Sequence, residues 1–86
     1  PHSWDAEMMA IWTSYLVEQV QAESKPTPLV RTAVKQLARS CPPESVAEVI
    51  TAVAPLVDNH PGWKGILNEM VRLLRFRHEM YKEMGR

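Results

Sequence analysis

The sequence offers only a few side chains that could ligate a metal ion: His2, His60, His78 and Cys41. A structural zinc site holds its ion with four such ligands, which come in closely spaced pairs. None of these four residues lies within one or two helical turns of another. We therefore expect no metal site in this chain, and no motif that we find requires a cofactor.

The single cysteine, Cys41, precedes the prolines Pro42 and Pro43. At the end of a predicted helix, it is better explained as a small apolar group than as a nucleophile. A lone cysteine cannot form an internal disulfide, which fits a reducing, intracellular compartment, the cytoplasm first and the nucleus as an open alternative. The sequence contains neither a transmembrane run nor a signal-peptide pattern, so we expect no membrane partner.

Carboxylates are scattered rather than paired. General acid–base catalysis needs two such groups held in a pocket, and a small helical domain has little room for one. The ten acidic residues are better explained as caps, first-turn charges and solvated helix faces: Asp5, Glu7, Glu18, Glu23, Glu44, Glu48, Asp58, Glu69, Glu79 and Glu83. There is also no glycine-rich phosphate loop and no nucleophile elbow. We expect no catalytic residue and no small-molecule substrate, although the chain could be an accessory domain of an enzyme.

Basic residues form two rows on predicted helices. The row on the second helix is Arg31, Lys35 and Arg39, and the row on the last helix is Lys64, Arg72, Arg75, Arg77, Lys82 and Arg86. If the two helices are adjacent, the rows could merge into a face that binds nucleic-acid phosphates. Against this, the net charge is zero and Glu69, Glu79 and Glu83 interleave with the second row. Solvated faces, phosphate contacts and an acidic protein partner stay open as interpretations.

Apolar residues at three- and four-residue spacing, separated by prolines, predict the elements that carry these side chains. We predict an all-α, single-domain bundle of about four helices: roughly 4–23, 28–40, 45–57 with a kink at Pro55, and a long C-terminal helix at 61–84. With 86 residues the chain is too short for a second core. A lone valine-rich strand at 46–53 would have no partner, so we prefer a helix there.

Helix ends are predicted from capping signals. These are Ser3 for the first helix, Thr27 with Pro28 for the second, Ser45 with Glu48 for the third, and Asn59 or His60 with Pro61 for the last, which Gly85 would end. The opening Pro-His-Ser resembles the remnant of a cleaved tag. We therefore take 1–3 as remnant and cap, and 4–86 as one domain cut from a larger intracellular protein.

The first helix is predicted to bury a broad apolar face. Its main stripe is Trp4, Met8, Ile11, Trp12, Tyr15 and Leu16, and Met9, Val17 and Val20 widen it. Because this face is broad, we expect the helix to contact neighbours on two sides.

The last helix carries two apolar rows. The inner row runs from Trp63 to Leu74, and its continuation would place Arg77, His78 and Tyr81 on the buried side. A second row, rotated away from the first, consists of Leu73, Phe76, Met80 and Met84. The end of this helix should project past its shorter neighbours or pack only on the first helix.

Two explanations of the second row remain open: packing against the first helix, or a surface that binds a protein partner or a second copy. Flexible methionines suit a binding surface. From the row we expect a non-catalytic protein-interaction or oligomerisation module. The alternative is a nucleic-acid-associated domain that uses Arg31, Lys35, Arg39, Lys64, Arg72, Arg75 and Lys82.

Overall fold

The computed structural model describes residues 4–84, except for the side chain of Met84, and within that range every regular element is helical. The elements are α1 (Ala6–Ala22), α2 (Pro28–Ser40), α3 (Val46–Val53) and α4 (Lys64–Met84), with short 3₁₀ turns at Pro43–Ser45, Ala54–Leu56 and Pro61–Trp63. The predicted all-α bundle with a long C-terminal helix is confirmed. The prediction for Gly85 lies outside the described residues.

Local signals explain several of these boundaries. The Thr27 hydroxyl accepts a hydrogen bond from the Val30 N–H at 3.2 Å, and Pro28 occupies the first turn, so the predicted cap of α2 is confirmed. The kink at Pro55 is also confirmed, because α3 ends at Val53 and continues as the 3₁₀ turn Ala54–Leu56. Proline has no N–H to donate, which breaks the regular helical ladder there.

Other predicted caps are wrong. Asp5 caps α1, accepting a hydrogen bond from the Met8 N–H at 2.8 Å, while Ser3 lies outside the described residues. Ser45 makes no capping hydrogen bond and is buried, because the turn that begins at Pro43 already leads into α3. His60 precedes the turn into α4 without a side-chain cap.

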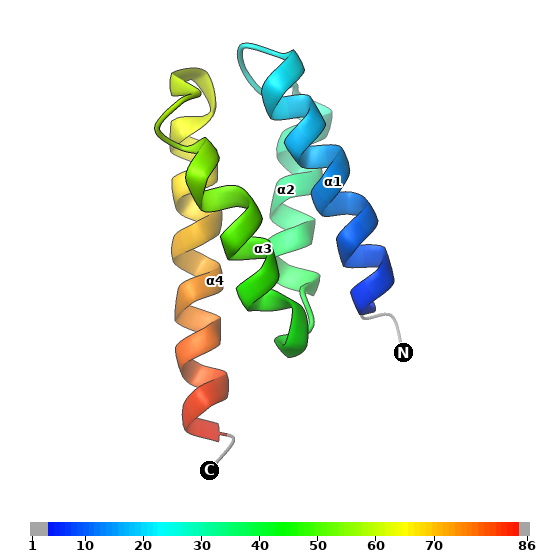
Figure 1. Ribbon diagram of the computed structural model, residues 1–86, viewed down its shortest axis with the longest axis vertical. Helices are drawn as coiled ribbons and strands as arrows, with labels where there is room; N and C mark the ends of the chain where they lie inside the picture. Colours follow the sequence, from blue (N-terminus) through cyan, green and yellow to red (C-terminus); the bar gives the residue numbers. More distant parts are fainter. Residues whose placement is uncertain (1–3, 85–86) are drawn as a thin grey trace.

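The four helices surround one core. Both α1 and α4 pack on α2 and on α3. Figure 1 shows α1 and α4 on opposite sides of the molecule, with α3 in front of α2 between them. Because α1 packs on α2 and α3 rather than on α4, it does not cover the apolar residues on the outer side of α4.

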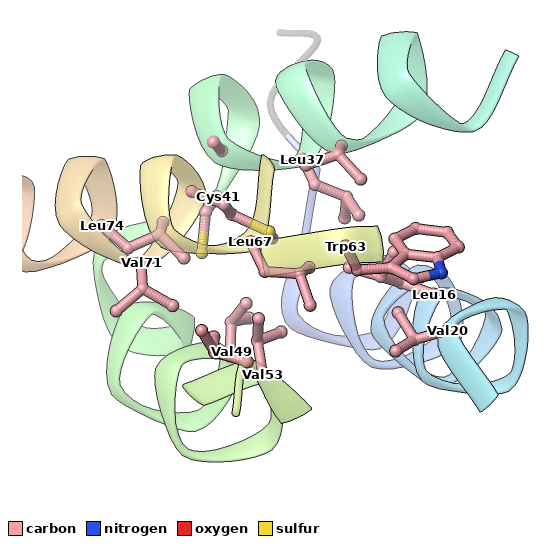
Figure 2. Close-up of a cluster of buried hydrophobic side chains, with 14 of the residues drawn as sticks. Leu16, Val20, Leu37, Cys41, Val49, Val53, Trp63, Leu67, Val71 and Leu74 are labelled. Carbon is pink, nitrogen blue, oxygen red and sulfur yellow. The ribbon is translucent and has the colours of Figure 1, made fainter. Parts of the chain in front are cut away.

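The core is built mainly of valine and leucine side chains from all four helices, with Trp63 among them (Figure 2). Trp63 is 1% exposed, and its indole N–H donates a hydrogen bond of 2.8 Å to the carbonyl oxygen of Glu23 at the end of α1. One side chain therefore anchors the start of α4 to both the core and the end of α1.

The predicted buried face of α1 is partly wrong. The buried stripe is Met9, Thr13, Leu16 and Val20, which lie along one line of the helix. Met8, Ile11 and Tyr15 are exposed, whereas Trp4 and Trp12 are half-buried and stack on each other with ring centroids 5.7 Å apart. Only one stripe can face the centre of the bundle, and the one that continues to Val20 keeps contact along the whole helix.

Candidate interaction surface

The outer row of α4 is exposed. Leu73, Phe76 and Met80, which we call the α4 apolar row, are 39%, 62% and 45% exposed, and the side chain of Met84 lies outside the described part. The interpretation that this row packs against the first helix is wrong, because α1 lies on the other side of the bundle (Figure 1).

The end of α4 extends past α2. Arg77 reaches the backbone carbonyls of Ala38 and Cys41, which mark the end of α2. The residues from Arg77 to Met84 add about 10 Å of helix at 1.5 Å per residue. Figure 1 shows this end of α4 reaching beyond its neighbours, as predicted. Phe76 therefore lies level with the end of α2, and Met80 lies beyond it.

Arg77 joins α2 to α4. Its guanidinium donates hydrogen bonds to the carbonyl oxygens of Ala38 and of Cys41, the latter at 2.7 Å. It also lies 2.5 Å from the Tyr81 hydroxyl and over the Tyr81 ring. The last carbonyls of a helix lack partners within the helix and carry partial negative charge, so a cation placed there is stabilising. Arg77, His78 and Tyr81 are half-buried, as predicted, and Arg77 is occupied by structural contacts.

Replacing Arg77 with methionine should lower the free energy of unfolding by about 1.5–3 kcal/mol, because two carbonyls lose a charged donor while the apolar stem is kept. For a domain of this size we expect a fall of roughly 10 °C in the melting temperature. Arg75→Met, at an exposed position, is the control and should change stability by less than about 0.5 kcal/mol. Equal melting temperatures for the two variants would contradict this role of Arg77.

A groove runs between α2 and α4. Its cavity volume is about 250 Å³. The residues that line it are Val34, Lys35, Ala38 and Arg39 of α2, and Ile66, Glu69, Met70 and Leu73 of α4. Val34, Ala38 and Met70 are buried, whereas Lys35, Arg39 and Glu69 are exposed. The α2–α4 groove therefore has an apolar floor and charged rims, and Leu73 connects it to the α4 apolar row.

The basic residues of α2 and α4 are all exposed except Arg77, but they do not gather on one face; Arg86 lies outside the described residues. Lys35 and Arg39 line the α2–α4 groove, and Arg31 precedes them in the same row. Arg75 lines a different depression, between α3 and α4, with His78 and Glu79. At 3.6 residues per turn, Lys64 and Lys82 lie on the same side of α4 as Arg75, which is the side towards α3. Arg72 lies between this flank of α4 and the flank towards α2.

A second apolar surface lies between α1 and α2. This α1–α2 groove, about 430 Å³ in volume, is lined by Ile11, Trp12, Tyr15, Leu29, Val30 and Ala33. Leu29 is 77% exposed and Ile11 is 62% exposed. This surface was not expected from the sequence, because Ile11 and Tyr15 were placed in the core. The available signal was Leu29, an apolar residue at the second position of α2, outside the inner face of that helix.

Cys41 is buried at the end of α2, with its sulfur 3.6 Å from the Pro42 carbonyl oxygen, as the sequence position predicts. Burial raises the pKa of its thiol above the ordinary value; the Arg77 guanidinium lowers this pKa by a smaller amount, and Glu44 raises it further. A neutral, buried thiol is a poor nucleophile.

Cys41 should therefore react with a thiol reagent at pH 8 at least about a hundredfold more slowly in the folded protein than in denaturant.

The raised pKa of Cys41 also makes the free energy of unfolding depend on pH. Above the ordinary thiol pKa the unfolded chain loses its proton before the folded chain does, so the free energy of unfolding falls as pH rises through this window. Denaturant titrations between pH 7 and pH 10 should show this fall for the wild type, and a smaller one for Cys41→Ala. An identical fall in both proteins would contradict the assignment.

Within residues 4–84, no three or more His, Cys, Asp or Glu side chains are grouped so that they could hold a metal ion. Across the same residues, no helix combines the length and the apolar character needed to cross a membrane.

Comparison with known proteins gives one match. A protein-family model covers residues 1–84, and its description is a family of unknown function, DUF5691. Neither a curated protein nor a solved structure matches the chain significantly.

Proposed function

This chain belongs to DUF5691, a family of unknown function. From the geometry of the chain, we propose that it is a helical protein-interaction module that binds its partner through α4. The α4 apolar row carries this proposal. It is the outer face of the longest helix, and the α2–α4 groove adjoins it at Leu73. The module has no catalytic role of its own and either serves a larger protein or joins two copies of the chain.

The hydrophobic effect supports this proposal. Single exposed apolar residues are common on soluble proteins, but a contiguous set is typical of an interaction site. Leu73, Phe76 and Met80 follow one another at helical spacing, so a partner could cover all three at once. Burying a fully exposed large apolar side chain contributes roughly 1.5–3 kcal/mol, and these three are about half exposed, so covering the row adds about half of that for each residue towards the binding energy.

Nucleic-acid binding has weaker support. Lys35 and Arg39 lie at the α2–α4 groove, whereas Arg75 lies on the α3 side of α4. Arg77 is occupied by carbonyl oxygens. A phosphate backbone laid along one flank would therefore miss the basic residues of the other.

Phe76→Asp should abolish partner binding while leaving the fold intact, because Phe76 is 62% exposed and its replacement removes apolar area and adds charge. Light scattering at two concentrations tests self-association, and affinity capture that compares variant with wild type tests binding to other proteins. Circular dichroism checks folding.

Ile11→Asp is the matched control, because Ile11 has the same exposed fraction but lies in the α1–α2 groove. It should retain every partner that Phe76→Asp loses. Loss of binding with Ile11→Asp alone would place the site in the α1–α2 groove. Binding that survives both substitutions would refute the proposal.

A further inference from the structure

The charges around the α2–α4 groove have a definite pattern. Arg31, Lys35 and Arg39 are all exposed and recur every four residues along α2, so they lie about 6 Å apart along the axis. Lys35 and Arg39 form the α2 rim of the groove, and on the α4 rim the one charged residue is Glu69. Two positive charges therefore border the groove along α2, and Arg31 continues their row one turn before the groove.

The shape and chemistry of the groove suit a helix. A groove between two packed helices accepts the side-chain ridge of a third helix. Its floor is apolar, formed by Val34, Ala38 and Met70, and Leu73 and Phe76 extend the apolar surface along α4. An amphipathic helix could place its apolar stripe on this surface, with its axis along α2 and α4.

We infer that the α2–α4 groove binds an amphipathic helix of a protein partner that carries acidic residues along the edge facing α2. Glutamates spaced four residues apart on that helix repeat at the same 6 Å interval as Arg31, Lys35 and Arg39, so they can meet these charges together. Glu69 on the opposite rim favours a neutral or basic residue at the other edge, which fixes the orientation of the bound helix. This inference rests on the proposed function and adds to it the chemistry of the partner.

Two designed peptides test this inference. Both are helices of about 20 residues with the same leucine stripe and the same neutral residues along one edge of it; along the other edge, one peptide has glutamate and the other has lysine. Their binding to the whole chain is measured by fluorescence anisotropy at low salt, and a duplex DNA of similar length serves as a third probe. We expect the acidic peptide to bind at least about tenfold more tightly than the basic one, and the difference to shrink as salt screens the charges.

Charge reversal on α2 should reverse this preference. In the double variant K35E/R39E, the basic peptide should bind more tightly than the acidic one. The double variant R75E/K82E makes the same change in net charge on the α3 side of α4, and the acidic peptide should remain the tighter ligand. Circular dichroism of both variants checks that they fold.

The possible results distinguish failure of the acidic-helix inference from failure of the proposal that partners bind through α4. If both peptides bind equally and Phe76→Asp abolishes both, the interaction surface stands and the acidic partner is refuted. If neither peptide binds, the acidic-helix inference is overturned, and the α4 proposal is decided separately by the effects of Phe76→Asp and Ile11→Asp on self-association and protein capture. Preferential binding of DNA, or a preference reversed by R75E/K82E instead, would also overturn the acidic-helix assignment.

Discussion

Trp63→Ala should lower the free energy of unfolding by about 3–5 kcal/mol, the largest loss that we expect from one substitution in this chain. The indole is 1% exposed within the core, so its removal leaves a cavity among close-packed side chains. It also removes the hydrogen bond to the Glu23 carbonyl and so loosens the start of α4 from the end of α1. Small domains have a total stability of only about 5–15 kcal/mol, so this loss removes a large share of it and should lower the melting temperature by at least about 12 °C.

One further substitution separates the ring from the hydrogen bond of Trp63, and a second, at Trp12, serves as a comparison. Trp63→Phe keeps much of the ring but loses the N–H donor, and should cost about 1–2 kcal/mol. Trp12→Phe changes a half-buried ring on α1 and should cost less than Trp63→Phe. Urea titrations followed by circular dichroism measure all three variants. A Trp63→Ala midpoint close to that of the wild type would contradict the anchoring role of Trp63.

Gly62→Ala should cost about 3 kcal/mol, for a reason of space rather than backbone conformation. No glycine in the described residues has a positive φ. A Cβ atom at Gly62 would lie 1.9 Å from the carbonyl oxygen of Ser24, closer than any real contact. Because the obstacle is backbone, the loop after α1 or the turn before α4 would have to move.

Gly65→Ala is the matched control for this prediction. Gly65 lies in the first turn of α4, and a Cβ there meets nothing within 4 Å. Alanine lowers the entropy of the unfolded chain and favours the helix, so this variant should be more stable by about 0.5–1 kcal/mol. Thermal melts should therefore move in opposite directions for the two variants. A shared direction would contradict the close approach of Gly62 to Ser24.

The fold was predictable because the strongest signals in this chain are local. Proline cannot continue a helix, and Pro42, Pro55 and Pro61 lie where the elements change. The cap predicted at Thr27 and Pro28 also depends only on neighbouring residues, and it forms as predicted. The cap predicted at Ser45 does not form, because Ser45 is the last residue of the 3₁₀ turn that begins at Pro43 and leads directly into α3.

The surfaces were harder to predict because they depend on which helices are neighbours. The apolar pattern of α1 contains two adjacent stripes, and the bundle buries the one that includes Met9 and Leu16. Ile11 and Tyr15 were therefore placed in the core, although they line an open groove. The row of Leu73, Phe76 and Met80 was recognised, but only the position of α1 on the far side of the bundle decides that it is uncovered.

Arg77 illustrates the same limit. Its spacing places it on the buried side of the last helix, yet nothing in the sequence names the carbonyls of Ala38 and Cys41 as its partners. Those contacts are made by residues distant in the chain. They remove Arg77 from the basic row that the sequence suggested for nucleic acid.

The central claim is that partners bind on α4 and the adjoining α2–α4 groove. The most direct test is to titrate the ¹⁵N-labelled chain with the acidic helical peptide and follow backbone amide shifts by NMR. We predict that the largest changes fall on Lys35, Arg39, Leu73 and Phe76, with little change at Ile11 and Leu29. Changes centred on Ile11 and Leu29 would contradict the account and identify the α1–α2 groove as the binding surface.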